Sequence, residues 1–402
     1  MIETTTHIKT NKQLVPALRF KEFDDLWKKS TIEDHFEFKN GLNKEKEFFG
    51  YGTPIINFKD VYNLEGIKLN DIKGLVKLSE NEIKRYDALK GDVFFTRTSE
   101  TIFDIGMAAA LVEDIPNCVF SGFVLRARPI DNALVDDYKK FCFGTWSVRK
   151  EIVTKSSFTT RALTSGTLLN KVAFHFPKSH NEQQKIASFL SAVDDKVQQL
   201  TKKKELLEQY KKGVMQQLFS GQLRFKDQNG NPYPDWEEKR LGGLCSTTTG
   251  KLDANAMRED GEYRFYTCAR EYYQIDKYAF DTEALLVSGN GANVGYIHYY
   301  KGKFNAYQRT YVLDEFEQNI FYIKKYLEKN LYERIHVEKK DGNTPYITLS
   351  TLTEMKVDLP SLPEQQKIAT CLSSIDTKIE AVNNQITQTQ TFKKGLLQQL
   401  FI

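Results

Sequence analysis

One hexapeptide occurs twice in the 402-residue chain, first as Glu182-Gln183-Gln184-Lys185-Ile186-Ala187 and, 182 positions later, as Glu364-Gln365-Gln366-Lys367-Ile368-Ala369. Carried forward without a gap, the same offset aligns residues 182–219 with 364–401 and gives 17 identities in 38 positions. Agreement over so many positions is not expected by chance, and it indicates an internal duplication.

Both copies carry apolar residues at the spacing of a coiled coil. Alternating steps of four and three from Ile186 and from Ile368 reach ten positions in each copy, and eight of the ten are apolar. This period, sustained over about five heptads, predicts two long amphipathic helices with a narrow apolar seam. At 1.5 Å per residue each helix would be about 57 Å long, too long to be buried alone in a compact domain. We therefore expect the two helices to pack on each other as an antiparallel coiled coil.

A second, shorter repeat is formed by Leu18-Arg19-Phe20-Lys21 and Leu223-Arg224-Phe225-Lys226, each followed by a tryptophan. The chain is therefore expected to alternate globular parts and helices. The predicted order is an N-terminal segment (1–18), a first globular domain (19–180), a first helix (181–221), a second globular domain (222–362) and a second helix (363–402).

Both globular parts contain strand-like runs together with short helical segments. The strand-like runs lie at 92–96, 118–120, 123–126, 284–287, 296–300 and 310–313, and a helix is expected at 321–331. The predicted fold is therefore α+β, with two globular domains separated by two long helices and with pseudo-twofold symmetry that follows from the duplication.

The composition excludes several classes of protein. Hydrophobic residues make up 40% and charged residues 27%, which is typical of a globular chain and not of a disordered one. The net charge of +4 neither requires nor excludes a nucleic acid. No stretch is long and apolar enough for a membrane helix, and no signal peptide is recognised. The five cysteines are scattered without a C-x-x-C pair, so we expect reduced thiols and a cytoplasmic location.

No enzyme motif is found in the sequence. The glycine-rich segment 288–295 does not have the spacing of a nucleotide-binding loop, and a tight turn between two strands is expected there. The six histidines never occur at i and i+4, so no zinc-protease site is expected. Asn231-Pro232-Tyr233-Pro234 lacks the double proline of the adenine-methyltransferase motif and predicts a turn. We predict no catalytic residue, no metal site and no cofactor for this chain.

The repeated hexapeptide, the alternation of globular part and helix, and the matched ends 211–219 and 393–401 together resemble the specificity (S) subunits of type I restriction-modification systems. The resemblance covers nearly the whole chain. It implies two target-recognition domains, each followed by a conserved spacer helix, that read a bipartite DNA target. It also implies a non-catalytic subunit that binds double-stranded DNA, two methyltransferase (M) subunits and ATP-dependent restriction (R) subunits, with methylation and cleavage supplied by these partners.

Polar side chains on loops are the candidates for DNA contact, because bases are read through hydrogen bonds to their edges. The predicted base-reading residues are Arg97, Thr98, Ser99, Ser157, Thr159, Thr160 and Arg161 in the first domain and Asn290, Asn293, Asn343, Thr344 and Tyr346 in the second. Lys155, Lys251, Lys339 and Lys340 are predicted to contact phosphates. For each of these residues the alternative is a solvated loop side chain.

Three aromatic pairs could stack on an extruded base, although partly buried strand aromatics are the simpler explanation. They are Phe48-Phe49, Tyr272-Tyr273 and Tyr299-Tyr300.

The matched helix ends are the candidates for partner binding, because their residues are identical in the two copies, whereas a coiled-coil seam requires only that residues be apolar. The predicted partner-binding residues are Gln216, Gln217, Phe219, Gln398, Gln399 and Phe401. The alternative is that these ends pack on the globular domains of the same chain.

A different class of function stays open. A two-domain structural adaptor with a coiled-coil spacer and no DNA readout would share the duplication, but it would show no salt-dependent affinity for DNA. Within the family interpretation, one of the two domains could also be inactive.

Overall fold

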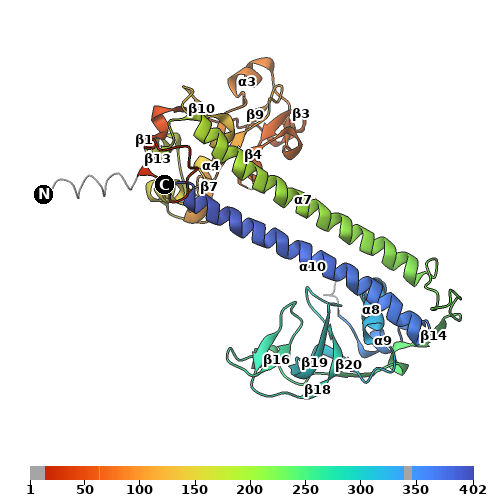
Figure 1. Ribbon diagram of the computed structural model, residues 1–402. Coiled ribbons are helices and arrows are strands. Elements are labelled where there is room, and N and C mark those ends of the chain that lie inside the picture. The colour runs from red at the N-terminus through yellow and green to blue at the C-terminus, as the bar shows by residue number, and fades with distance from the viewer. Residues whose placement is uncertain (1–13, 63, 339–345) are drawn as a thin grey trace. The chain divides into compact units, whose positions relative to one another are not determined.

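The computed structural model describes residues 14–62, 64–338 and 346–402. Packing divides the chain into two compact units: unit 1 comprises Met1–Leu200 and Gln385–Ile402, and unit 2 comprises Thr201–Asn384. Helices α7 (His180–Phe219) and α10 (Leu362–Gln399) each contribute one segment to unit 1 and one to unit 2. Both units mix helices with sheets, which confirms the predicted α+β class (Figure 1). The linear boundaries predicted for the domains stay a prediction.

Unit 1 is built around a five-stranded sheet in the order β2-β10-β6-β8-β4. Its strands are β2 (Phe36–Asn40), β10 (Val124–Pro129), β6 (Val93–Thr96), β8 (Ala108–Leu111) and β4 (Gly66–Ile67). The pairs are antiparallel except β4 with β8, which is parallel. All four residues of β6 are buried, as expected for a central strand without the polar alternation of a solvent-facing one.

Smaller elements complete unit 1. β1 (Lys28–Thr31) pairs with β13 (Ala173–Phe176), and β3 (Phe49–Ile56) lies between β5 (Leu75–Val76) and β9 (Val119–Phe120). A third small sheet consists of β7 (Thr98–Ser99), β12 (Ala162–Leu163) and β11 (Ser157–Phe158). The shorter helices are α2 (Phe58–Tyr62), α3 (Glu80–Arg85), α4 (Asp136–Cys142), α5 (Trp146–Lys155) and α6 (Gly166–Asn170), with 3-10 turns at Ile32–Asp34, Lys46–Phe48, Leu69–Asp71 and Ile102–Asp104.

Unit 2 contains a six-stranded sheet in the order β15-β20-β18-β19-β16-β17. Its strands are β15 (Ser246–Thr249), β20 (Thr310–Asp314), β18 (Phe280–Ser288), β19 (Ile297–Ala306), β16 (Tyr263–Tyr266) and β17 (Tyr273–Ile275). Only the pair β16 with β19 is parallel. The other elements are β14 (Glu237–Arg240), which pairs with β21 (Lys356–Leu359), α9 (Leu349–Thr353) and 3-10 turns at Leu241–Gly243 and Ala254–Ala256.

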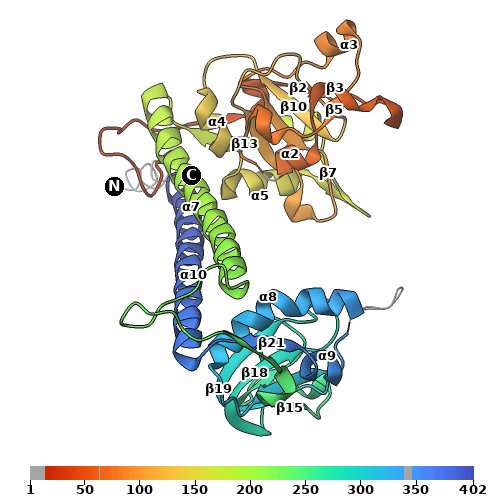
Figure 2. The same ribbon diagram turned by 90° about the vertical axis from the view of Figure 1, so that its right-hand side faces the viewer.

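Helix α8 (Ile320–Glu338) covers one face of this sheet (Figure 2). Leu285, Val287 and Leu313 of the sheet share a core with Leu327 and Leu331 of the helix. Ala284 and Leu286, which alternate with Leu285 and Val287 along β18, point to the opposite face and belong to a separate small core. The period of two along the strand therefore separates a helix-covered face from a second face.

The strands and turns expected from the sequence are present. Each of the six strand-like runs overlaps a strand (β6, β9, β10, β18, β19 and β20), and the helix expected at 321–331 lies inside α8. The glycine-rich segment 288–295 is the turn between β18 and β19, and Gly291 and Gly295 adopt positive φ there.

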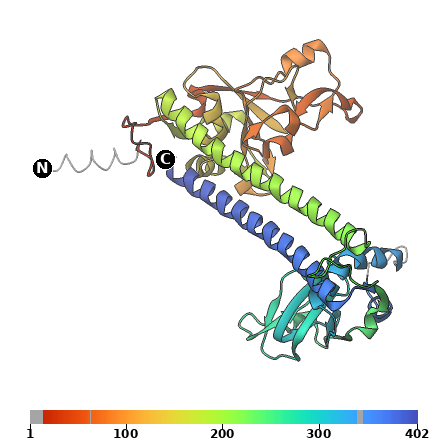
Figure 3. The same ribbon diagram turned by 45° about the vertical axis from the view of Figure 1, so that its right-hand side comes forward.

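In each unit a segment of α7 lies beside a segment of α10 that runs in the opposite direction, which confirms the predicted antiparallel pairing (Figure 3). Burial follows the predicted seam. The buried seam residues are Ile186, Leu190, Val193, Leu200 and Leu218 on α7 and Ile368, Leu372, Ile375, Val382, Leu396 and Leu400 on α10. The other seam positions are half-buried.

The two lysines that the repeat offset relates within the seam, Lys211 and Lys393, form ion pairs with the opposite helix. In unit 2, Lys211 Nζ lies 2.6 Å from Asp376 Oδ1. In unit 1, Lys393 Nζ lies 2.5 Å from Asp194 Oδ1 and 2.6 Å from Glu65 Oε2. Because the repeat offset relates Lys211 to Lys393 and Asp194 to Asp376, the duplication has kept the same ion pair in both units.

The repeated Glu-Gln dipeptide anchors the start of each long helix. Glu182 is 1% exposed and accepts hydrogen bonds from Arg19 Nε at 2.7 Å, Arg19 Nη2 at 2.8 Å and Trp27 Nε1 at 3.2 Å. In unit 2, Glu364 is fully buried and accepts the equivalent bonds from Arg224 and from Trp236. We call each set the Arg-Glu-Trp anchor. It explains why the second, shorter repeat and its tryptophans accompany the hexapeptide.

The glutamine that follows also serves as an anchor. Gln183 Nε2 donates to the carbonyl oxygens of Ala133 and Pro177, both at 2.8 Å, and its Oε1 accepts from the Val135 N–H at 2.8 Å. Gln365 donates to the Pro360 carbonyl at 2.8 Å in the same manner. These buried amides tie each helix start to the loop that precedes it and to a neighbouring loop.

Candidate nucleic-acid interface

In unit 1, short strands bring two segments of predicted base-reading residues together. β7 pairs with β12, and β12 pairs with β11. The register sets Thr98 opposite Leu163 and Ser99 opposite Ala162, while Ser157 also lies opposite Leu163. The hairpin 159–161 therefore belongs to the same small sheet as the segment 97–99.

The side chains of this hairpin are available to a ligand. Thr159, Thr160 and Arg161 are exposed, whereas Thr98 is half-buried. Arg161 Nη2 lies 3.0 Å from Glu100 Oε1, but both side chains are more than 60% exposed. An exposed ion pair contributes less than about 1 kcal/mol. Arg161 can therefore exchange Glu100 for a base edge or a phosphate at little cost.

Arg97 and Lys155 differ in what holds them. Arg97 is exposed and lines a cavity of about 630 Å³ together with Lys39 and Asn40 of β2. Lys155 Nζ lies 2.5 Å from Glu151 Oε2, and this hydrogen bond is the main cause of the lowered pKa of the Glu151 carboxyl. No ion pair of Arg97 is found in the described part of the chain, so Arg97 is the stronger candidate.

In unit 2, Asn290 and Tyr346 face each other across an isolated antiparallel bridge. Next to the bridge, the Ile347 N–H donates to the Gly289 carbonyl at 2.8 Å, and Tyr311 Oη donates to the Ile347 carbonyl at 2.9 Å. Asn290 and Tyr346 line a cavity of about 450 Å³. Two distant chain segments therefore converge in unit 2, as two others do in unit 1.

Gln308 and Arg309 line the same cavity and are missing from the sequence-based prediction. They are exposed in the turn between β19 and β20. The Arg309 carbonyl accepts a 2.8 Å hydrogen bond from the Gly289 N–H, which fixes this turn beside the glycine-rich one. Their position in the sequence, as two polar residues between two strand-like runs, could have identified them. The reasoning that selected Asn290 applies equally to these two residues.

The other predicted residues of the second domain are placed less favourably or lie outside the structure. Asn293 is engaged within the chain: its Nδ2 donates to the Cys268 carbonyl at 3.1 Å, and its Oδ1 accepts from Arg270 Nε at 3.4 Å. Lys251 is exposed directly after β15. Four further predicted residues lie outside the described residues, namely Lys339, Lys340, Asn343 and Thr344.

Tyr299, a member of one of the three aromatic pairs, is a packed strand residue. Its ring lies 4.7 Å from that of Phe321, and its hydroxyl donates to Glu283 Oε1 at 2.7 Å. Burial, together with this hydrogen bond, raises the pKa of Tyr299 to about 12. Tyr272 and Tyr273 are each 41% exposed, so a ring surface is available there.

The matched helix ends divide into buried rings and exposed amides. The Phe219 ring lies 5.6 Å from that of Tyr322, and the Phe401 ring lies 5.6 Å from that of Tyr138; both phenylalanines are 6% exposed. Each ring fills the core of its own unit, which favours the alternative that these rings pack within the chain; a partner contact by the rings stays a prediction. Gln216, Gln217, Gln398 and Gln399 are exposed.

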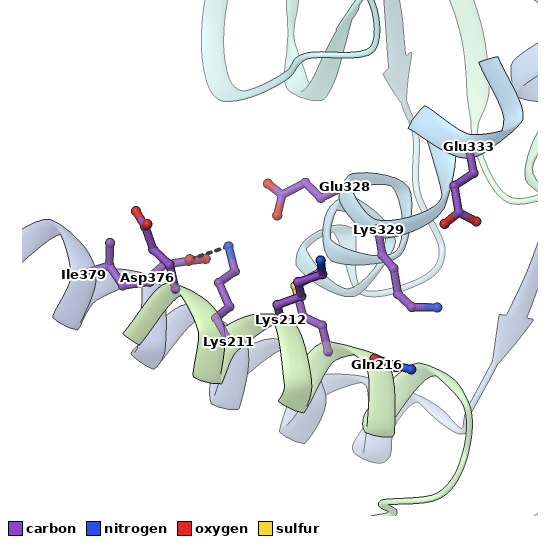
Figure 4. Close-up of a pocket in the computed structure, with 10 residues that line it drawn as sticks. Lys211, Lys212, Gln216, Glu328, Lys329, Glu333, Asp376 and Ile379 are labelled. Atoms are coloured by element: carbon purple, nitrogen blue, oxygen red, sulfur yellow. Dashed lines mark ion pairs between the residues drawn. The ribbon is translucent and has the colours of Figure 1, made fainter. Parts of the chain in front are cut away.

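Gln216 lines a further cavity of about 710 Å³ between the end of α7, α8 and the start of α10 (Figure 4). Lysine and glutamate side chains surround this cavity, and the Lys211–Asp376 ion pair lies at one side of it (Figure 4). Glu328 is also occupied, since Lys325 Nζ lies 2.8 Å from its Oε2. Most of the residues that line the cavity are charged, together with the apolar Met215 and Ile379.

Residues 14–62, 64–338 and 346–402 contain no group of three or more His, Cys, Asp or Glu side chains with the geometry of a metal site. Within the same residues, no helix has the length and apolar character required to cross a membrane.

Both halves of the chain match a single protein family. The family model described as the type I restriction modification DNA specificity domain matches residues 24–209 and again residues 233–389. The chain is 39% identical over 164 residues to the EcoDI type I specificity subunit of Escherichia coli, a match that spans 41% of this chain and 36% of that subunit. It is 24% identical to the MjaIX type I specificity subunit of Methanocaldococcus jannaschii over 93% of this chain and 92% of that one.

Solved structures share the fold. The crystal structure of a type I restriction-modification S subunit from M. genitalium superposes with a TM-score of 0.61 at 18% identity, over 96% of this chain and 99% of that chain. A chain from work on complex assembly and conformational transition of the type I R-M system superposes with a TM-score of 0.54 at 14% identity, over 93% and 97% of the two chains.

Proposed function

The chain belongs to the type I restriction modification DNA specificity family, and we propose that each of its two units reads one half of a bipartite DNA target. The chain is a specificity subunit and supplies DNA sequence specificity to a type I restriction-modification system. Because unit 1 and unit 2 present different sheets and different loops, we expect the two half-sites to differ.

One observation carries this proposal. In each unit, polar residues from separate chain segments converge on one surface: Arg97–Ser99 with Ser157–Arg161 in unit 1, and Asn290 with Gln308, Arg309 and Tyr346 in unit 2. Base readout needs several hydrogen-bonding groups at fixed relative positions, and backbone pairing between the segments provides that fixation.

Membership of the same family also suggests the partner subunits and the source of the catalytic activities. Two methyltransferase subunits and ATP-dependent restriction subunits supply methylation and cleavage, while this chain is non-catalytic and acts with them in the cytoplasm. The exposed Gln216, Gln217, Gln398 and Gln399 contact the methyltransferases, because these matched amides face solvent while the neighbouring phenylalanines do not.

Co-expression with the cognate methyltransferase tests these proposals. The purified complex should bind a duplex carrying its target more tightly than a scrambled duplex, with an affinity that falls steeply between about 0.05 and 0.2 M salt. In the same preparation, Gln217→Ala plus Gln399→Ala should reduce recovery of the methyltransferase. The matched control is Gln198→Ala, an exposed glutamine of α7 outside the matched end.

Absence of any salt-dependent DNA binding by an intact complex would favour the adaptor function instead. Unchanged recovery of the methyltransferase with the glutamine variants would remove the helix ends from the docking surface.

A further inference from the structure

Arg264 of β16 is held between two aromatic rings. Its guanidinium carbon lies 4.3 Å from the centroid of the Tyr272 ring and 4.5 Å from that of the Tyr300 ring. Its recorded hydrogen bond is from Nη1 to Tyr266 Oη at 3.4 Å, a long one. Contact with two rings restricts the guanidinium, and in the described part of the chain no hydrogen-bond partner is found for its donors other than the one that reaches Tyr266.

This guanidinium has no carboxylate partner in the described part of the chain: no ion pair of Arg264 is found there. Other arginines of the molecule are paired, for example Arg19 with Glu182 and Arg128 with Asp92. Glu262 and Glu271 are close to Arg264 in sequence, yet neither forms an ion pair with it in the described part of the chain. A fixed, partly desolvated and unpaired guanidinium is a site prepared for an external anion with in-plane acceptor oxygens.

Arg264 lies on the sheet face opposite α8. Residues i and i+2 of a strand share a face, so Arg264 lies with Tyr266, whose ring belongs to the small core on that side. β16 is the second strand from the β17 edge of the sheet. The side chain is therefore on a face that α8 does not cover.

Ring contacts connect Arg264 to the predicted base-reading surface. Tyr266 lies 5.0 Å from His298, and His298 lies 4.8 Å from Tyr296. Arg270 stacks on Tyr296 at 5.5 Å and donates to Asn293. We call this set of contacts the arginine–tyrosine strip; it consists of Arg264, Tyr266, Arg270, Tyr272, Tyr296, His298 and Tyr300. The Tyr266 ring is buried in the small core and links the more exposed members. Asn293, which accepts the hydrogen bond from Arg270, lies in the same glycine-rich turn as Asn290.

We propose that the arginine–tyrosine strip binds the phosphate backbone of the DNA that unit 2 reads, with Arg264 as its principal phosphate ligand. The proposal rests on the proposed function, because it assumes that unit 2 contacts DNA. A phosphate fits this site since it offers two oxygens in the geometry of the guanidinium fork. Base edges are the less suitable ligands here, because Arg264 lies on a sheet face flanked by rings and not on a protruding loop.

The experiment uses the full chain in complex with its methyltransferase and two duplexes of equal length, one with the target and one scrambled. Arg264→Gln should weaken binding to both duplexes by the same factor, about fivefold at 0.15 M salt, and should lower the slope of log affinity against log salt by about one. Arg264→Lys keeps the charge but loses the planar fork, and it should also weaken both, by about threefold.

The matched control is Arg258→Gln, because Arg258 is a 65% exposed arginine of the same unit that faces Asp276 only at 3.8 Å. Its effect should stay within about twofold, as expected for an exposed pair. Should Arg264→Gln have no larger effect than this control, or should Arg264→Lys behave as the unchanged chain does, the strip is an ordinary charged surface and the proposal is wrong.

Two other outcomes would also overturn it. Loss of affinity for the target duplex alone would make Arg264 a base reader, and loss of the methyltransferase with unchanged DNA affinity would make the strip a protein contact. Failure of the unchanged complex to bind DNA would instead refute the proposed function, so the two failures are distinguishable.

Discussion

Glu182 and Glu364 are carboxylates buried at the starts of α7 and α10, each surrounded by an arginine fork and an indole N–H. A buried carboxylate is tolerated only when it is paired and hydrogen-bonded, and removal of one partner leaves the other charge unpaired. The geometry of each anchor therefore depends on the glutamate more than on any other single side chain of the repeat.

Glu182→Gln should lower the free energy of unfolding of the segment that contains the anchor by about 3 kcal/mol, because Arg19 would stay largely buried without its counter-charge. Glu364→Gln should cost somewhat less, about 2 kcal/mol, since Arg224 is more exposed. Urea denaturation combined with limited proteolysis would measure both effects and show which unit opens first. The control is Glu205→Gln, an exposed partner of Lys202, with an expected cost below about 0.5 kcal/mol. Equal costs for all three variants would contradict the anchoring role.

For single residues, the sequence shows which ones are repeated but not what their side chains contact. A glutamate and two glutamines at the start of an amphipathic helix are expected on the solvated face, yet Glu182 and Gln183 are buried. The partners of Glu182, Arg19 and Trp27, are more than 150 positions away, so only the folded chain reveals these contacts. The same holds for Phe219 and Phe401, whose identity in both copies reflects packing in each unit.

Among the elements, α7 and α10 were the most predictable, because a period of 3.5 sustained over about five heptads leaves few alternatives. The strands β7, β11 and β12 could not be predicted, because two residues carry no period. These short strands nevertheless bring the segment 97–99 and the hairpin 159–161 together. The candidate site was therefore predicted as separate loops, and its assembly came from tertiary pairing.

The ion pairs between the helices predict a pH dependence. Burial opposes ionisation of Asp376, but hydrogen bonds from Lys211 and Lys325 outweigh it and hold the pKa of this carboxyl below its ordinary value. A carboxyl whose pKa is lowered by folding stabilises the fold above its unfolded pKa of about 4. This contribution shrinks as the pH falls through that value and is lost below the folded pKa.

Asp376→Asn should therefore lower the free energy of unfolding by about 1–2 kcal/mol at pH 7, and the difference from the unchanged chain should narrow as the pH falls through about 4. Urea denaturation at a series of pH values measures this difference. Glu65→Gln is the comparison. Burial raises the pKa of Glu65, and Lys393 would still be paired with Asp194 in this variant. Glu65→Gln should therefore lower the free energy of unfolding at pH 7 by less than about 1 kcal/mol. A loss with Asp376→Asn that is independent of pH would contradict this account of the ion pair.

For the whole molecule, the duplication preserved the anchors and the helix pairing while the sheets diverged. Unit 1 has a five-stranded sheet and unit 2 a six-stranded one, but both have an Arg-Glu-Trp anchor and a lysine–aspartate pair between α7 and α10. Two different half-sites require recognition sheets that differ, carried on helices that are anchored in the same way. The sequence predicts this organisation, whereas the target itself depends on loop geometry and DNA deformation and does not follow from residue types.

The central claim, one half-site for each unit, is tested most directly by replacing residues 19–180 with the matching segment of a relative that has a different target. The chimera is expressed with the cognate methyltransferase, and adenine methylation is mapped across a genome by long-read sequencing. We predict a split motif in which one half changes, while the other half and the gap between them stay as in the unchanged chain. A motif that changes in both halves, or in neither, with methylation intact, would contradict the account.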